Sequence, residues 1–232
     1  MITKSKEILH LTVLLLLLIF PLSAAAAGNV VVIDPGHGGN NTGVTLSKGL
    51  HEKDVTLAVA KLVRKDLSGA KNIKVRLTRL DDEGVSLAKR KKVSGKSDVD
   101  LFISLHVNAG FGLKAKGYEI YYPVIGVPLA KQSNSQAIVN NMEQNRCINN
   151  SVRFAQIVQK NMTKVFPREG RGLRNAPVLV LQSLSTPAVL LEIGFATNPE
   201  NKTKLKDKKI QKAVADALTR SIKKYFSNDG TL

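Results

Sequence analysis

Apolar and polar positions along this chain follow two periods, one typical of buried strands and one typical of amphipathic helices. Residues 30–34 and 101–105 are short and predominantly apolar, which is the pattern of strands buried inside a parallel sheet. Residues 73–77 alternate apolar and basic side chains, so we expect a strand near an edge of the sheet. Further short apolar runs cover residues 118–122, 178–181 and 188–193.

Helical periodicity separates these runs. Between residues 55 and 67, apolar side chains recur three and four positions apart, with Lys and Arg on the opposite face. The same pattern predicts helices over residues 152–166 and 210–226. Two further helix starts are indicated by N-cap residues, Ser86 before a short basic helix and Asn198 before Pro199.

Strands that alternate with helices predict a single α/β domain whose sheet is covered by helices on both faces. No internal repeat and no second domain is evident, so residues 28–232 are expected to form one unit. Residues 124–150 fit neither period. They are rich in Gln and Asn, and a segment of this length with weak periodicity is typical of a functional or mobile loop.

The first 27 residues have the organisation of a secretory signal peptide. Lys4 and Lys6 precede an apolar run at residues 11–20, and small residues follow at 23–27. The run is too short for a bilayer span, which needs about 20 apolar residues. No cysteine follows it directly for lipid attachment. We therefore expect residues 1–27 to be cleaved and the protein to be exported without a stable membrane anchor.

The charge balance narrows the class of partner. The chain carries 35 Lys and Arg against 18 Asp and Glu, a formal charge of +17. Such an excess indicates a cell-wall polymer, an anionic lipid surface or nucleic acid as partner, unless the lysines only keep the surface soluble. The chain has no Trp, which argues against stacking on single-stranded nucleic acid. The only cysteine, Cys147, excludes an intramolecular disulfide and a cysteine-based zinc site.

Three polar side chains interrupt or follow the apolar runs, namely His37, His106 and Glu192. In an open α/β sheet, ligand sites lie beyond the carboxyl ends of the strands. Each residue alone fits a partnered core side chain, but together they favour a site, because burying an unpartnered His or Glu is costly. Two histidines and a carboxylate suit zinc, with a fourth position open. Glu52 is the candidate third ligand, with neighbouring His51 as the alternative, and Glu52 would otherwise stabilise a helix N-terminus.

Several motifs in chain order carry a resemblance to a known family. They are Val-Val-Ile-Asp-Pro-Gly-His37-Gly-Gly, Glu52-Lys-Asp-Val-Thr-Leu-Ala, Leu-Thr-Arg79, Ser-Leu-Ala-Lys-Arg90, Asp100-Leu-Phe-Ile-Ser-Leu-His106-Val-Asn-Ala, Gly117-Tyr-Glu-Ile-Tyr-Tyr and Pro187-Ala-Val-Leu-Leu-Glu192-Ile-Gly-Phe-Ala-Thr-Asn-Pro. Together they resemble the zinc-dependent N-acetylmuramoyl-L-alanine amidases of bacterial cell walls, the Amidase_3 type. The match spans nearly all of residues 28–232.

The resemblance implies a mixed, mostly parallel sheet of about six strands flanked by helices on both faces. It also implies that His37, Glu52 and His106 hold one Zn²⁺ per chain and that Glu192 is the catalytic carboxylate. The substrate would be peptidoglycan, cleaved between N-acetylmuramic acid and the L-alanine of the stem peptide. The biological role would be wall turnover or daughter-cell separation, and the enzyme would be located in the periplasm or the extracellular wall. Asn108, just after His106, is a candidate for binding substrate or for shaping its loop.

The resemblance also assigns a role to residues 124–150. In relatives that are regulated during cell division, an insertion at this place forms a helix that covers the zinc until an activator protein displaces it. Residues 128–147 are therefore a candidate lid, and Glu143, its only acidic residue, is a candidate for the open zinc position. The alternative for Glu143 is a solvated loop carboxylate.

Two other classes of function stay open at this point. A wall-binding protein would keep the fold without the chemistry, although the presence of Glu192 argues against it. A binder of nucleic acid or lipid that is driven by positive charge would show salt-sensitive binding that needs no metal.

Overall fold

The computed structural model describes residues 28–124, 135–167 and 169–227. The predicted signal peptide, residues 1–27, lies outside these ranges. Among the helices of the described ranges, none combines the length and the apolar composition that a bilayer crossing requires.

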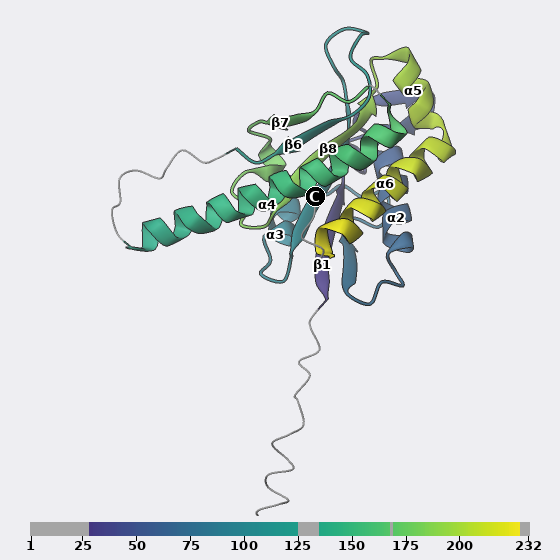
Figure 1. Cartoon of the computed structure of the whole chain (residues 1–232). Helices are drawn as coiled ribbons and strands as arrows, with labels where there is room; N and C mark the ends of the chain where they lie inside the picture. The colour runs from purple at the N-terminus through teal and green to yellow at the C-terminus, as the bar shows by residue number, and fades with distance from the viewer. Residues whose placement is uncertain (1–27, 125–134, 168, 228–232) are drawn as a thin grey trace, which may run out of the picture.

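A six-stranded sheet forms the centre of the fold (Figure 1). Its strands are β1 (Asn29–Pro35), β4 (Ile73–Leu77), β5 (Leu101–Asn108), β6 (Glu119–Tyr122), β7 (Leu173–Asn175) and β8 (Ala188–Phe195). They lie in the order β4, β1, β5, β8, β6, β7, and all neighbours are parallel except β6 and β8. The predicted α/β class with a mixed, mostly parallel sheet is thus confirmed, and β4 is the edge strand that its alternating pattern predicts. A separate hairpin joins β2 (Thr45–Ser47) to β3 (Leu50–His51).

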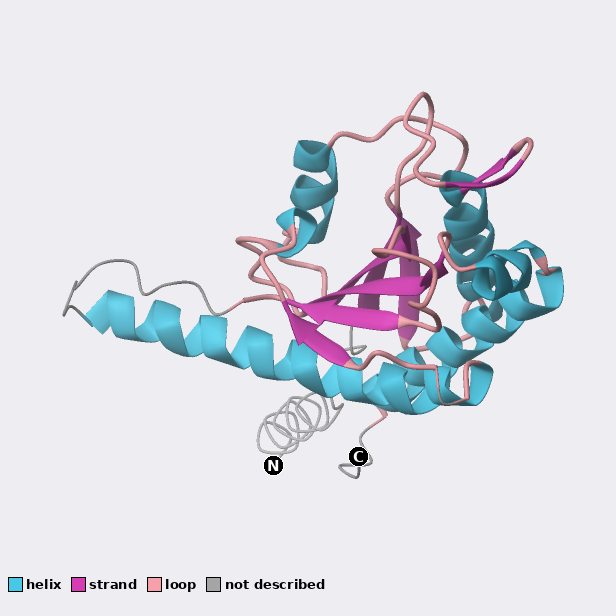
Figure 2. Ribbon diagram, turned by 90° about the horizontal axis from the view of Figure 1, so that it is seen from above, coloured by secondary structure: helices cyan, strands magenta, loops and turns pink. Residues whose placement is uncertain are grey.

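Helices cover the two faces of the sheet unequally. The main core lies between one face and the helices α2 (Glu52–Asp66), α4 (Ser135–Val165) and α6 (Lys208–Phe226). A smaller core on the other face involves the short helix α3 (Leu87–Ser94) and the 3₁₀ turn η1 (Leu179–Leu181). Figure 2 shows α3 on one side of the sheet and α4 along the opposite side. The remaining helix is α5 (Pro199–Lys206), capped as predicted by the Asn198 side chain, which accepts from the amide of Asn201.

The register of the strands places three polar side chains on the face of the sheet that the smaller core covers. Side chains alternate along a strand, so residues two apart share a face. His106 on β5 pairs with Glu192 on β8, and Glu192 pairs with Glu119 on β6. The three polar side chains therefore follow one another across the sheet, on the same face as the smaller core.

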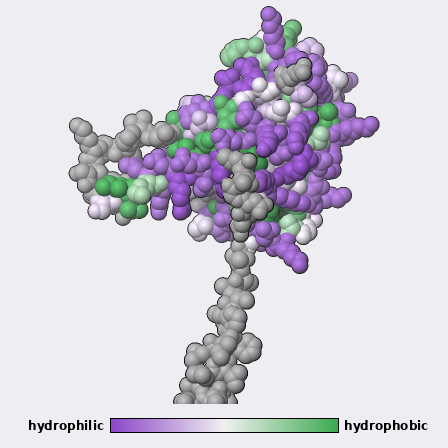
Figure 3. Space-filling view, viewed as in Figure 1, coloured by the Kyte–Doolittle hydropathy of each residue, from purple (hydrophilic) through white to green (hydrophobic). Residues whose placement is uncertain are grey.

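The long helix α4 corrects the prediction for residues 124–150. The expected helix at 152–166 begins 17 residues earlier, at Ser135, so residues 135–150 are helical and not a loop, while 125–134 lie outside the described residues. The polar first part of α4 projects beyond the sheet (Figures 1 and 2). Little of it packs against the protein before Cys147 and Ile148, so no buried apolar face runs along it for periodicity to detect. Its exposed apolar side chains include Ile138, Val139 and Met142, and Figure 3 shows apolar surface at this projecting end.

Candidate metal centre

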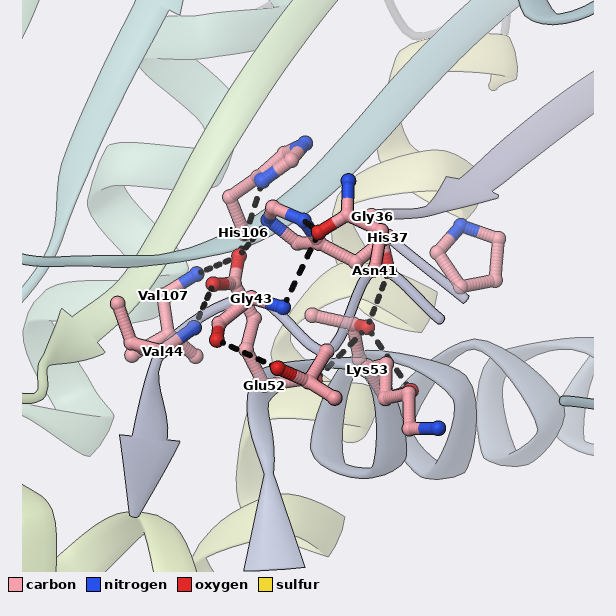
Figure 4. A network of polar contacts seen from close by, with 12 residues as sticks. Gly36, His37, Asn41, Gly43, Val44, Glu52, Lys53, His106 and Val107 are labelled. Atoms are coloured by element: carbon pink, nitrogen blue, oxygen red, sulfur yellow. Dashed lines mark hydrogen bonds and ion pairs between the residues drawn. The ribbon is translucent and has the colours of Figure 1, made fainter. Parts of the chain in front are cut away.

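Three side chains from separate segments converge at the carboxyl end of the sheet (Figure 4). His37 lies in the loop after β1, Glu52 is the first residue of α2, and His106 lies near the end of β5. Glu52 Oε1 is 3.0 Å from His37 Nε2 and 2.9 Å from His106 Nδ1. One ligand atom from each residue lies within 4.8 Å of the others. This spacing allows a single ion to contact all three.

Backbone and side-chain contacts orient the three groups. The amides of Val44 and Val107 donate to the two Glu52 oxygens at 3.0 and 2.9 Å. His37 Nδ1 lies 2.8 Å from Asn41 Oδ1, so the ring donates its Nδ1 proton there and keeps Nε2 for a metal. Burial alone would raise the pKa of Glu52, but hydrogen bonds with His106 and His37 lower it to about 2. The carboxylate is therefore ionised at neutral pH, the form that binds a metal.

Two glycines leave the room that these side chains need. A Cβ atom on Gly36 would lie 2.5 Å from His106 Cε1. One on Gly43, whose φ is +65°, would lie 2.4 Å from Glu52 Oε2 and 2.7 Å from His37 Cδ2. The backbone is thus shaped around two imidazoles and a carboxylate, a donor set that suits zinc with a fourth position open. The residues present fit a zinc ion.

Replacing Gly43 with Ala is expected to weaken zinc binding by at least about tenfold, because the new methyl group displaces Glu52 and His37. Gly49→Ala is the matched control. Gly49 has a similar φ of +75° but nothing lies within 4 Å of the added atom, so the control carries the backbone strain alone. Competition with a chromogenic chelator measures both affinities, and equal values for the two variants would contradict this packing.

A pair of buried arginines fixes the loop that carries His37. This residue has a φ of 61°, a strained conformation for a side chain other than Gly. Arg90 donates to the carbonyl of His37 at 2.6 Å and also contacts the buried carboxylate of Asp34. Arg79 donates to the carbonyls of Gly36 and Lys53 at 3.0 and 2.8 Å, which ties the loop to α2.

Sequence reasoning assigned no role to Asp34, Arg79 or Arg90. The available signal is Asp34, a charged residue at the end of an apolar strand, because a buried charge demands a partner. Which arginine pairs with Asp34 depends on tertiary contacts, and no local sequence pattern shows these contacts.

Glu192 lies beside the three converging groups. Its backbone pairs with that of His106, and its Oε2 is buried without a hydrogen-bond partner in the described part of the chain. Such an atom is costly unless a ligand or a proton completes it. Burial, together with the negative charges of Glu52 and Glu119, raises the pKa of Glu192 to about 8. A carboxyl group with a pKa this near neutrality is suited to accept and release a proton.

The other predicted site residues are placed differently. His51 contacts Thr45 through Nδ1 at 3.3 Å and stays outside the converging group, which leaves Glu52 as the third candidate ligand. Asn108 donates its amide to Glu119 at 3.1 Å. Glu143 is exposed on α4 and lines a cavity with Ser97, Arg146 and Pro187. The structure does not bring Glu143 to His37, Glu52 and His106, so its role at the metal stays a prediction.

A cleft of about 490 Å³ opens beside the two histidines. His37 and His106 line it together with apolar side chains of the loop before α3 and of η1. Leu87 and Leu179 on its walls are 40% and 62% exposed. A ligand therefore has access to the three converging groups from the thinly covered face of the sheet.

The chain is similar to known proteins over most of its length. The family model described as N-acetylmuramoyl-L-alanine amidase, Amidase_3, matches residues 31–224. The chain is 31% identical to the N-acetylmuramoyl-L-alanine amidase AmiA of Escherichia coli over 85% of this chain and 76% of that protein. It is also 31% identical to CwlM, an N-acetylmuramoyl-L-alanine amidase of Bacillus licheniformis, over 85% of this chain and 68% of the relative. The crystal structure of an N-acetylmuramoyl-L-alanine amidase from Clostridium difficile 630 superposes with a TM-score of 0.72 at 31% identity, covering 88% of this chain and all of the other.

Proposed function

Because this chain belongs to the N-acetylmuramoyl-L-alanine amidase family, we propose that it is a peptidoglycan hydrolase that uses one zinc ion per chain. The bond cleaved joins N-acetylmuramic acid to the L-alanine of the stem peptide. The observation that carries the proposal is the convergence of His37, Glu52 and His106 beside the unpartnered oxygen of Glu192. The presence of this carboxylate disfavours a protein that only binds the wall.

In the proposed reaction, three side chains bind the metal and Glu192 transfers the proton. His37, Glu52 and His106 would hold the zinc ion, which would serve as a Lewis acid for a carbonyl oxygen and would lower the pKa of water to near neutrality. Glu192 accepts the proton of the attacking water and returns it to the amine nitrogen of the departing L-alanine. Asn41 keeps the His37 ring in one tautomer throughout.

Digestion of purified peptidoglycan tests this function. Residues 28–232 are expected to release stem peptides that carry a new N-terminal L-alanine, with release abolished by a chelator and restored by zinc. Release of reducing sugar ends, or of peptides at an undiminished rate in chelator, would contradict the proposal.

An enzyme that hydrolyses peptidoglycan must be exported to reach it. Export through the signal peptide at residues 1–27 would bring the enzyme to the periplasm or the extracellular wall, where its substrate lies. Residues 28–232 carry a formal charge of +16, which would favour encounter with anionic wall polymers, an effect that fades as ionic strength rises. Wall turnover or daughter-cell separation is the role we propose.

We also propose that residues 124–150 regulate the enzyme and that an activator protein is the partner that binds them. The exposed side chains of Ile138, Val139 and Met142 on the projecting part of α4 give such a protein an apolar surface to bind.

Deleting residues 128–146, which keeps the buried Cys147 in place, is expected to raise basal hydrolysis if this segment restrains the enzyme. Initial rates on soluble muropeptides measure the change, and thermal unfolding checks that the shortened protein is folded. An unchanged or lower rate in a folded protein would count against the lid.

A further inference from the structure

Two arginines flank a buried glutamate at the far side of the sheet. The side chain of Glu119 is 4% exposed, while those of Arg171 and Arg174 are 41% and 44% exposed. Arg171 Nε lies 3.5 Å from Glu119 Oε1, and Arg174 Nε contacts the same oxygen. The second oxygen, Oε2, accepts from Asn108 Nδ2 at 3.1 Å and from the Tyr121 hydroxyl at 2.9 Å. Both oxygens of Glu119 are therefore already occupied.

This cluster has more positive charge than its carboxylate requires. One negative charge faces two guanidinium groups, and each contacts it through Nε. The shortest contact of each arginine with Glu119 is made through Nε, and 41% and 44% of the two side chains stay exposed. The Arg171 guanidinium also lies over the Phe195 ring at 5.5 Å, which helps to hold it in place. Two partly exposed guanidinium groups thus face one buried carboxylate, and planar groups of this kind suit a further carboxylate.

The cluster lies in line with the candidate metal centre. His106, Glu192 and Glu119 are register partners across β5, β8 and β6, and Arg174 pairs with Tyr121 one strand further on. Neighbouring strands are about 4.8 Å apart, so β7 lies about 10 Å beyond Glu192. An extended peptide advances about 3.3 Å per residue, so about three residues span this distance. The side chains of Arg171 and Arg174 reach back to Glu119, which is only one strand from Glu192, so a peptide that crosses Glu192 from the reacting amide meets them near its second residue.

We propose that Arg171 and Arg174 form a binding site for the free carboxylate of the second residue of the stem peptide, an inference that rests on the proposed function. This residue is a D-glutamate joined onward through its side-chain carboxyl group, so its α-carboxyl group is either free or amidated. The cleft lined by Leu87 and Leu179 lies over the other part of the same face and leaves room for the uncharged sugar. The charged peptide end of the substrate would therefore bind at the arginines and the uncharged sugar end in the cleft.

Paired substrates that differ only in this group test the site. The wild type is expected to cleave muropeptides with the free carboxylate at least tenfold more efficiently than their amidated forms, judged by kcat/KM, with most of the difference in KM. Arg174→Gln is expected to bring this ratio close to one, while Arg174→Lys keeps part of it because it retains the charge but loses the fork. Arg64→Gln, an exposed arginine on α2, is the matched control for net charge and should keep the wild-type ratio.

Calorimetric binding of the same two muropeptides to Glu192→Gln protein separates this inference from the proposed function. Tighter binding of the free carboxylate form, lost when Arg174→Gln is added, supports the arginine site whether or not the wild type cleaves either substrate. Absence of cleavage by the wild type would defeat the proposed function alone. Equal binding of the two muropeptides, or an Arg174→Gln variant that weakens both to the same extent, would show a merely structural role and overturn the proposal.

Discussion

Replacing Glu192 with Gln is expected to lower kcat on muropeptides by about 10²–10⁴-fold, the usual contribution of a general acid–base group. The amide has the shape of the carboxyl group but neither accepts nor delivers a proton at neutral pH. Because Glu192 is not one of the three converging groups, zinc content and thermal stability should stay near those of the wild type. Steady-state kinetics with metal analysis of the same preparation measures both properties.

The control for this variant is Glu83→Gln, which removes an exposed carboxylate before α3 and should leave kcat unchanged. A Glu192→Gln enzyme that keeps kcat within about threefold of the wild type would refute the proton-transfer role. Loss of zinc in step with activity would instead assign Glu192 to holding the metal.

Replacing Arg90 with Met is expected to destabilise the protein by about 3–5 kcal/mol, the usual effect of removing one partner of a buried ion pair. The change removes the ion-pair partner of the buried Asp34 carboxylate, to which the hydroxyls of Thr78 and Ser104 still donate. It also frees the carbonyl of His37, which has a strained backbone, so zinc affinity should fall as well. Urea unfolding and chelator competition measure the two effects.

The double variant Arg90→Met with Asp34→Asn separates these effects. Neutralising Asp34 removes the unpaired charge, so a large part of the lost stability should return. The contact with the His37 carbonyl is still missing, so zinc affinity should remain low. A single variant that loses less than about 1 kcal/mol, or a double variant with wild-type zinc affinity, would contradict this role for Arg90.

Sequence patterns predicted the elements whose burial imposes a period. The continuous apolar runs of β1 and β5 and the regular faces of α2 and α6 are such elements, since each packs against the main core. The first part of α4 escaped because it projects from the protein and has little to bury. The strand β7 escaped for another reason, since three residues are too few to show alternation.

The residues of the candidate site could be predicted where a polar side chain interrupts or follows an apolar run. His37, His106 and Glu192 could be found as polar residues at the ends of apolar runs, and the fold brings their strands together at one end of the sheet. The groups that orient them could not be found this way. Asn41 is one of several polar residues in a Gly-rich loop, and only the folded loop brings its oxygen to His37 Nδ1. Glu119 lies in an alternating strand, where its burial depends on two arginines distant in sequence.

The most direct measurement is anomalous X-ray scattering from crystals of the zinc-loaded protein, recorded on both sides of the zinc absorption edge. A single strong peak is expected within about 2.0–2.2 Å of His37 Nε2, His106 Nδ1 and a Glu52 oxygen, with Glu192 close by but not bound to it. A protein saturated with zinc that shows no peak among these three side chains, or shows its peak elsewhere, would contradict the metal centre on which the proposed hydrolysis depends.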